Sequence, residues 1–348
     1  MSVRVGIIGC GGISGFHLRG YEAVGAQVVH VADADAGRAR ARAAAFGCDW
    51  TTDYRRLLED PRVECVSICT PNHLHREHAE AALAAGKHVL CEKTMTTNPA
   101  DARALVEAVE KSGLVFQVAY MKRFLPAVRK ARELVPRLGK LLSGIVRVYH
   151  PMSREGLDSA GGDFWLLNPE KGGGGVLVHS GSHMLDMMRF LVGEPAAVDA
   201  RSHWHKGIID YYDTAYFQME AGFTMFFESG WLDLPNLGVR HNGWDERIEI
   251  TGENGRLEVY TMWWTRPEIE EPFVRFYSAE DREVHEYHPE IADCFVEEVK
   301  AFVEAVRSGT PASPNVRDGY MVQAMIDAVY RSSAEGRRVE IEKLEDPG

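Results

Sequence analysis

The chain has 348 residues, of which 45% are hydrophobic and 26% charged, so it is long enough for two globular domains and too apolar to be disordered. Its net charge of −12 argues against a general affinity for nucleic acid or for an anionic membrane surface. Because no apolar run approaches the length of a membrane span or of a signal peptide, and the six cysteines form no CxxC pair, we expect a cytoplasmic protein with reduced thiols.

Strand-like and helix-like stretches alternate over the first 123 residues. Strands are predicted at 3–8, 28–32, 65–69, 88–91 and 115–119, and helices at 17–24, 36–46, 77–85 and 100–112. Short apolar strands separated by helices of this length are typical of a parallel, doubly wound sheet. The sequence therefore predicts an α/β domain over residues 1–123.

The pattern changes after residue 123. Helices are predicted at 126–134, 176–191, 290–308 and 318–334, and strands at 144–149, 197–205, 212–220, 223–231, 245–251, 256–260, 273–278, 283–287 and 339–341. Turn residues at 221–222 and 253–255 indicate hairpins between neighbouring strands. Residues 124–348 therefore form an expected α+β domain with a large, mostly antiparallel open sheet.

A glycine-rich turn directly follows the first predicted strand. Gly9 suits a tight turn and Gly11 lets the backbone approach a pyrophosphate closely, and Gly12 and Ile13 are predicted to bind the cofactor beside them. The pyrophosphate would then rest at the positive N-terminus of the next helix. This arrangement predicts a dinucleotide-binding Rossmann domain, and the alternative is a glycine-rich turn that holds no ligand.

Asp33 lies at the end of the second predicted strand, 24 residues after Gly9. A carboxylate at this point accepts hydrogen bonds from the hydroxyls of the adenosine ribose and repels a 2′-phosphate. The nearest basic residue that follows is Arg38, five positions on. The cofactor is therefore predicted to be NAD, with Arg38 leaving NADP as the alternative.

A second signature begins at the third predicted strand. It consists of Cys69, Thr70, Pro71, Asn72 and His75, then residues 85–93, then Gly173, Gly174, Gly175, Gly181, His183 and Asp186. This set resembles the Gfo/Idh/MocA family of sugar and polyol oxidoreductases across both expected domains. The resemblance implies an N-terminal Rossmann domain and a C-terminal open sheet that binds substrate and mediates a homodimer or homotetramer.

The resemblance also implies which residues surround the cofactor and the substrate. It places Thr70, Pro71, Asn72 and His75 along NAD, Glu92 and Lys93 beside the nicotinamide ribose, and Arg123 and Trp165 in the same site. For Asn72 the alternative is a cap on the following helix, and for His75 it is packing in the interior.

Lys93 is the first candidate for a catalytic residue. The strand predicted at 88–91 directs its ammonium group toward the edge of the sheet where ligands bind. A partly desolvated lysine beside an oxidised nicotinamide loses its proton more readily and can serve as a base or a hydrogen-bond donor. The alternative is a solvated surface lysine.

Three residues depart from the family's pattern. Thr94 stands where the family usually has proline, often after a cis peptide bond, and a cis bond before threonine costs about 3–4 kcal/mol. We therefore expect a differently shaped chain after Lys93. His179 replaces the aspartate that usually lies four residues before the catalytic histidine, and Leu166 replaces the arginine that commonly follows the tryptophan.

His179 and His183 are four residues apart on one predicted helix, so their side chains share a face, which Asp186 joins. The resemblance makes His183 a ligand of the substrate hydroxyl and an acid/base group, with His179 as its partner. A second interpretation makes the two histidines a divalent-metal pair completed by His150, His203, His205, His241 or a carboxylate. A third places both in the core.

Three functions remain open at this point. The first is an NAD-dependent oxidoreductase that acts on a secondary hydroxyl of a sugar, glycoside or cyclitol. The second is an NAD-retaining glycosidase, lyase or epimerase that oxidises its sugar transiently, with or without a metal. The third is an NAD-sensing regulatory protein without catalysis. We expect a small-molecule sugar or polyol partner, and neither nucleic acid nor membrane.

Overall fold

The computed structural model describes residues 2–261 and 271–345, which fall into two compact units. One unit comprises Met1–Met121 together with Cys294–Gln323, and the other comprises Lys122–Asp293 together with Ala324–Gly348. The sequence assigns every residue after 123 to the second domain, whereas Cys294–Gln323 pack in the first compact unit. These residues form part of the first unit because their apolar side chains complete its core.

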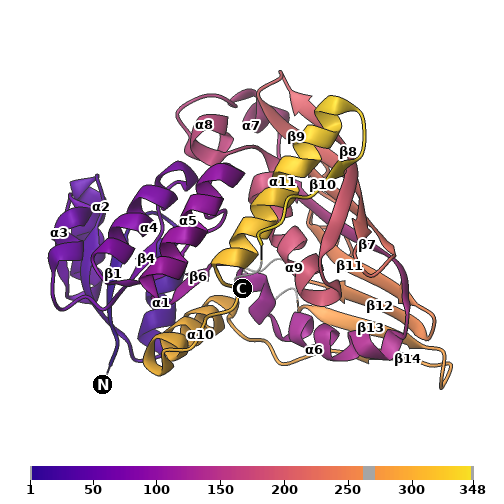
Figure 1. Ribbon diagram of the computed structural model, residues 1–348, viewed down its shortest axis with the longest axis horizontal. Helices are drawn as coiled ribbons and strands as arrows, with labels where there is room; N and C mark the ends of the chain where they lie inside the picture. Colours follow the sequence, from indigo (N-terminus) through magenta and orange to yellow (C-terminus); the bar gives the residue numbers. More distant parts are fainter. Residues whose placement is uncertain (1, 262–270, 346–348) are drawn as a thin grey trace. The chain divides into compact units, whose positions relative to one another are not determined.

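The first unit is built on a six-stranded parallel sheet in the order β3-β2-β1-β4-β5-β6 (Figure 1). Its strands are β1 (Arg4–Ile8), β2 (Gln27–Ala32), β3 (Asp49–Thr51), β4 (Cys65–Ile68), β5 (His88–Cys91) and β6 (Phe116–Val118). The reversal of strand order beside β1 is the doubly wound topology that the sequence predicts, and it confirms the Rossmann fold. Only the short β3 was missed.

Helices connect these strands. They are α1 (Ser14–Ala23), α2 (Ala36–Phe46), α3 (Tyr54–Glu59), α4 (His75–Ala84) and α5 (Pro99–Ser112), with a 3₁₀ turn η1 (Asn72–Leu74) before α4. Capping residues set several of their ends. Asp35 accepts hydrogen bonds from two backbone N–H groups at the start of α2, and Asn98 does the same for one at the start of α5.

The late segment α10 (Cys294–Ser308) packs against α1. A β-carbon added at Gly20 would lie 2.8 Å from Val299 Cγ2, so the glycine allows the two helices to approach closely. Val299, Phe302 and Val303 belong to the same buried cluster as the residues of β1 and α1. The apolar side chains of α10 therefore form part of the core of the first unit.

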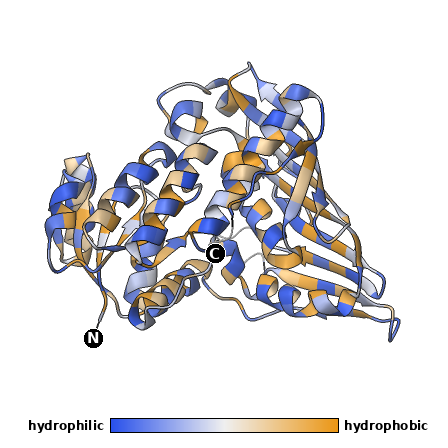
Figure 2. Cartoon of the chain, viewed as in Figure 1, coloured by the Kyte–Doolittle hydropathy of each residue, from blue (hydrophilic) through white to orange (hydrophobic). Residues whose placement is uncertain are grey.

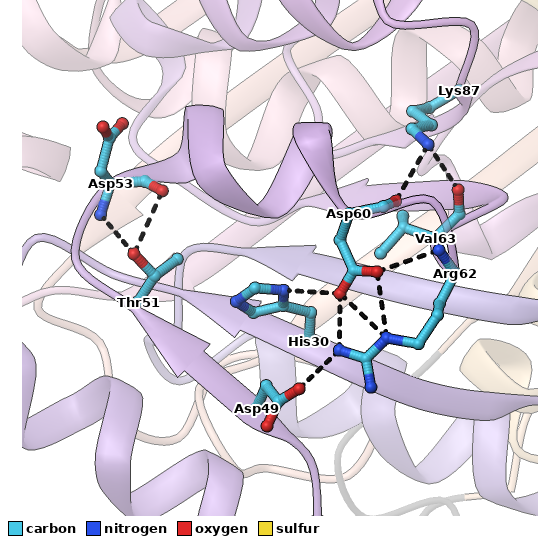
Figure 3. A network of polar contacts seen from close by, with 8 residues as sticks. All are labelled: His30, Asp49, Thr51, Asp53, Asp60, Arg62, Val63 and Lys87. Atoms are coloured by element: carbon cyan, nitrogen blue, oxygen red, sulfur yellow. Dashed lines mark hydrogen bonds and ion pairs between the residues drawn. The ribbon is translucent and has the colours of Figure 1, made fainter.

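A polar network ties together β2, β3 and the loop before β4 (Figure 3). Arg62 pairs with Asp60 and Asp49, and His30 Nδ1 lies 3.1 Å from Asp60 Oδ2. Lys87 Nζ donates to the carbonyl oxygens of Asp60 at 3.2 Å and of Val63 at 2.7 Å. Hydrogen bonds from Arg62 hold the pKa of Asp60 well below its usual range, so this carboxylate stays ionised at neutral pH.

The second unit contains a nine-stranded sheet in the order β14-β13-β12-β11-β7-β10-β9-β8-β15. Its strands are β7 (Leu141–Pro151), β8 (Pro195–His205), β9 (Ile209–Met219), β10 (Thr224–Leu232), β11 (Asp245–Gly252), β12 (Gly255–Tyr260), β13 (Phe273–Ser278), β14 (Val284–Tyr287) and β15 (Val339–Glu340). Every pair is antiparallel except β7 with β10, so the predicted sheet is confirmed. Figure 2 shows apolar and polar residues alternating along these strands.

Helices of the second unit lie mainly on one face of this sheet (Figure 1). They are α6 (Pro126–Leu134), α7 (Arg154–Asp158), α8 (Pro169–Gly172) and α9 (Ser182–Val192), with 3₁₀ turns η2 (Met121–Phe124), η3 (Val135–Leu138) and η4 (Trp165–Leu167). The last helix, α11 (Val316–Glu335), begins in the first unit and ends in the second. None of the helices in the described ranges has both the length and the apolar character needed to cross a bilayer.

The segment predicted as one helix at 176–191 consists of two parts. Residues Leu177–Gly181 form a π-helical turn, η5, and α9 follows directly. His179 therefore lies on the π turn and His183 on the α-helix. Single π turns within α-helices occur frequently at functional sites.

Candidate active site

The glycine-rich turn after β1 has the features of a pyrophosphate cradle. Gly9 has φ +96°, and a β-carbon there would lie 2.7 Å from the backbone of Cys69, so the turn needs glycine. In contrast, a β-carbon added at Gly11 or at Gly12 would meet no atom within 4 Å. Ile13 precedes α1 without a side-chain cap. Open space above an uncapped helix N-terminus fits the pyrophosphate of a dinucleotide.

Asp33 lies beside this turn at the end of β2. Its Oδ2 accepts a hydrogen bond from Cys10 N at 2.7 Å, and its Oδ1 accepts one from Asp35 N at 2.8 Å. These two bonds orient the carboxylate next to the glycine-rich turn, as its proposed role toward the ribose requires. Arg38 is exposed and pairs with Asp35 at 3.8 Å. The guanidinium closest to the turn belongs instead to Arg42.

Replacing Asp33 by serine is expected to raise the affinity for NADP relative to NAD by about tenfold or more, because a like charge beside the 2′-phosphate is removed. The matched control is Asp35→Ser, which keeps a helix-capping side chain two residues away. Dissociation constants for both cofactors, measured by quenching of protein fluorescence, test this. An unchanged ratio in Asp33→Ser would assign cofactor selection to another residue.

The turn after β4 carries four predicted cofactor ligands. Thr70 and Pro71 are half-buried, whereas Asn72 and His75 are buried. His75 Nε2 lies 2.7 Å from the carbonyl oxygen of Thr70, and its Nδ1 lies 2.8 Å from that of Thr94. Both ring nitrogens thus face protein carbonyls, and His75 is buried. The Asn72 amide donates to Thr94 Oγ1 at 3.2 Å.

His78 lies behind the same turn, with Nδ1 3.1 Å from Thr70 Oγ1 and its ring against the edge of Tyr54. Burial lowers the pKa of His78 from 6.5 to about 4. The unfolded chain therefore binds a proton that the folded chain rejects between these values, and stability falls as the pH drops through this range.

Across that range His78 is expected to remove roughly 3 kcal/mol from the free energy of unfolding. Urea unfolding between pH 6.5 and 4 should show a shallower pH dependence for His78→Gln than for the wild type. The exposed neighbour His73 serves as the control, because His73→Gln removes a histidine without removing a buried one. Equal slopes for His78→Gln and the wild type would contradict the prediction.

Lys93 follows β5 and is half-buried. The Glu92 carboxylate accepts the backbone N–H of Lys93 at 3.1 Å, and on its other side contacts His17 Nε2 at 2.9 Å. Burial raises the pKa of Glu92, but its hydrogen bond to His17 and the nearby charges bring it below the usual value. The Glu92 carboxylate is thus buried between His17 and the backbone of Lys93.

The peptide bond between Lys93 and Thr94 is cis, which corrects the expectation of a differently shaped chain at this point. Thr94 is buried, and its hydroxyl donates to the carbonyl oxygen of Thr96 at 2.9 Å while accepting the amide of Asn72. Neighbouring groups therefore hold Thr94 in place.

In the second unit His179 and His183 have different surroundings. His179 is 8% exposed and lies between two aromatic rings, parallel to Trp231 at 6.0 Å and edge-on to Trp165 at 5.7 Å. His183, one turn later on α9, is half-buried. His183 is therefore the more accessible of the two for a substrate, whereas His179 contacts Trp165.

The loop of three glycines before η5 is shaped by Asp210, which lies on β9. Asp210 Oδ1 accepts from Gly175 N at 2.6 Å and from the Tyr330 hydroxyl at 2.6 Å, and its Oδ2 accepts from Leu177 N at 2.8 Å. A β-carbon on Gly175 would lie 1.9 Å from the carbonyl oxygen of Asp210. These glycines thus allow the close approach of Asp210, which holds the start of the segment that carries both histidines.

Arg123 is engaged within the second unit. Its guanidinium donates to Asp186 on α9 through Nε at 2.7 Å and Nη2 at 2.5 Å, and both residues are buried. Its plane also lies over the Phe190 ring. This paired geometry makes Arg123 an anchor for α9.

A buried polar network lies behind the π turn. Lys122 pairs with Glu246, whose other oxygen lies 2.8 Å from His150 Nε2, and His150 Nδ1 lies 2.9 Å from Ser180 Oγ. Lys122 and Glu246 are almost fully buried. His150, which the sequence offered as a possible third metal ligand, is therefore part of this network.

Metal ligation by the histidine pair receives no support from the geometry. Across residues 2–261 and 271–345, the one group of three metal-ligating side chains within mutual reach is Asp281, Glu283 and His285, at an exposed hairpin. His205, another proposed third ligand, lies 3.0 Å from Asp158.

Three supporting residues were missed in the sequence. Arg42 Nη2 donates to the carbonyl oxygen of Gly11 at 3.0 Å, His17 contacts Glu92, and Asp210 caps the second glycine loop. For His17 a signal was present, since it is a polar residue on the face of the first helix that the apolar neighbours Leu18 and Tyr21 share. Asp210 offered none, because its partners lie 33 to 120 residues away.

Comparisons with known proteins match both parts of the chain. A family model described as an oxidoreductase family with an NAD-binding Rossmann fold matches residues 3–120, and the model of its C-terminal alpha/beta domain matches residues 137–341. Inositol 2-dehydrogenase 2 of Saccharopolyspora erythraea is 29% identical over 358 aligned positions, covering 100% of this chain and 98% of that protein. Levoglucosan dehydrogenase of Pseudarthrobacter phenanthrenivorans is 27% identical, covering 90% of this chain and 89% of that protein.

A solved structure of levoglucosan dehydrogenase in complex with NADH and levoglucosan has a TM-score of 0.88 to this chain, at 26% identity, and covers 99% of this chain and 100% of that one. The matched models span both units, and the glycine-rich turn has the space that a dinucleotide requires. The chain therefore belongs to the Gfo/Idh/MocA family of oxidoreductases, and its first unit is an NAD(H)-binding Rossmann domain.

Proposed function

We propose that this protein is a dehydrogenase that oxidises a secondary hydroxyl of a sugar, glycoside or cyclitol with NAD. The observation that carries the proposal is Lys93, which follows β5 at the carboxyl edge of the parallel sheet with its backbone held by Glu92. The names of the relatives, inositol 2-dehydrogenase and levoglucosan dehydrogenase, support a cyclic polyol as substrate.

Each unit contributes a group that can move a proton. Lys93 orients the substrate hydroxyl and takes up its proton, and His183 is the candidate acid/base group that the second unit offers. NAD, when bound, accepts the hydride from the carbinol carbon. His179 lies between Trp165 and Trp231 and carries no negative charge. The pair of His179 and His183 therefore differs in charge and in proton-binding groups from a histidine–aspartate pair.

The test is a panel of myo-inositol, levoglucosan and methyl glucosides, each supplied with NAD, in which NADH absorbance is followed. We expect at least one cyclic polyol to reduce NAD, with the ketone identified by mass spectrometry. Net dehydrogenation would be refuted if the protein is folded and binds NAD, but none of these compounds leads to reduction of NAD.

The second candidate is a reaction that retains NAD. It is favoured because His179 stands where the family usually has aspartate, and because aromatic side chains enclose the His179 ring. It predicts NAD that co-purifies with the protein and deuterium from solvent in the product. Neither is expected of the dehydrogenase, so the same panel run in heavy water separates the two functions.

The proposal includes a cytoplasmic location and a homodimer or homotetramer formed through the nine-stranded sheet. On the sheet face that points away from α6 and α9, Tyr216, Phe226 and Ile145 are paired across adjacent strands, and Tyr216 is 58% exposed. An exposed apolar row of this kind suits a second copy of the chain. Light scattering of the wild type and of Tyr216→Arg tests it, and a monomeric wild type would exclude the interface.

A further inference from the structure

Thr94 is the clearest departure of this chain from its family near the proposed catalytic lysine, and its hydroxyl has specific partners. It accepts the amide of Asn72 at 3.2 Å and donates to the carbonyl oxygen of Thr96 at 2.9 Å. A proline at this position has no hydroxyl and could make neither contact. Thr94 is 2% exposed, so these bonds form away from water.

A second connection runs beside the first. His75 lies between the carbonyl oxygens of Thr70 and Thr94, at 2.7 and 2.8 Å from its two ring nitrogens. Burial lowers the pKa of His75, and a neutral ring has one N–H, so it donates to one carbonyl at a time. The ring is 0% exposed and fills the space between the two chain segments.

These contacts join two segments that the main chain does not connect directly. Thr70 and Asn72 belong to the turn after β4, whereas Thr94 and Thr96 follow β5. The geometry points to a clasp, formed by Asn72, His75 and Thr94, that sets the position of Lys93 relative to the turn after β4. It rests on the proposed function in that Lys93 and this turn serve the reaction, and its members are positioning residues.

Binding of NAD tests the clasp without any sugar. The experiment compares Thr94→Val, which keeps the shape and removes the hydroxyl, with Thr94→Ser, which keeps the hydroxyl. We expect Thr94→Val to raise the Kd for NAD by about fivefold, the equivalent of one hydrogen bond, and Thr94→Ser to stay within about twofold of the wild type.

The matched control is Thr96→Val. Thr96 is also buried, but its hydroxyl donates to the carbonyl oxygen of Asn98 and does not touch the turn after β4. Thr96→Val should lower the melting temperature as Thr94→Val does, and it should leave the Kd for NAD unchanged. The proposed clasp is wrong, and Thr94 only stabilises the fold, if Thr96→Val weakens NAD binding as much as Thr94→Val does. The same conclusion follows if Thr94→Ser does not keep the NAD affinity of the wild type.

A double-mutant cycle with Asn72→Ala adds a measurement that does not depend on one variant. If the two side chains act together, Asn72→Ala weakens NAD less in the Thr94→Val background than in the wild type. The proposal would be overturned if the fold-increase in Kd of the double variant equals the product of the fold-increases of the two single variants. A wild type that binds NAD but oxidises no polyol would refute the proposed function alone, since every readout here is cofactor binding.

Discussion

Replacing Lys93 by methionine is expected to lower kcat for the substrate found in the polyol panel by about 10²–10⁴-fold, with NAD still bound. Methionine keeps the length of the side chain and removes the group that takes up the hydroxyl proton. The backbone of residue 93 is held through Glu92 and the neighbouring Thr94, so the variant should fold as the wild type does. Stopped-flow single turnovers separate the chemical step from product release.

Lys87→Met is the control for this substitution. Lys87 precedes the same strand and its Nζ donates to two carbonyl oxygens, so its loss should reduce stability. Because Lys87 lies at the opposite end of β5 from Lys93, kcat per folded molecule should not change. A Lys93→Met variant with the turnover of the wild type would remove this lysine from the mechanism.

Replacing Glu246 by glutamine is expected to destabilise the second unit by roughly 3–5 kcal/mol, because it leaves the Lys122 ammonium buried without a counter-charge. Burial raises the pKa of Glu246, but Lys122 and His150 hold it well below its usual range. The carboxylate also accepts the hydroxyl of Thr261 at 2.8 Å. Chemical unfolding of NAD-free protein, followed by tryptophan fluorescence, measures the loss.

The double variant Lys122→Met with Glu246→Gln should recover much of that stability, since neither charge is then left alone in the interior. The exposed pair Lys130 and Glu133, 3.0 Å apart, provides the comparison, and Glu133→Gln should change stability by about 1 kcal/mol or less. Additive losses in the double variant would mean that the buried pair is not coupled.

Element types and the cofactor turn could be predicted from the sequence because both depend on local patterns. The strand at His88–Cys91 and the helices at Ala36–Phe46 and Pro126–Leu134 have the predicted bounds. The missed β3 has three residues, which is too short for an alternating pattern to be recognised.

Side-chain directions at the strand ends could not be predicted in the same way. Glu92 is directed toward the interior because His17, 75 residues earlier, meets its carboxylate, and Arg123 is occupied by Asp186, 63 residues later. A strand pattern shows where a residue lies along the chain but not which distant partner it finds. The contacts of Glu92 and Arg123 with these distant partners could therefore not be predicted from the local motif.

The packing of α10 against α1 has a consequence for how the protein is made. The first unit draws Val299, Phe302 and Val303 into the core that Leu18 and Tyr21 share, so its interior is incomplete until residues 294–323 have left the ribosome. The N-terminal 121 residues would wait, with an apolar helix face exposed, for most of the chain to be synthesised. We therefore expect the core of the cofactor-binding domain to be completed only near the end of translation, although its glycine-rich turn is made first.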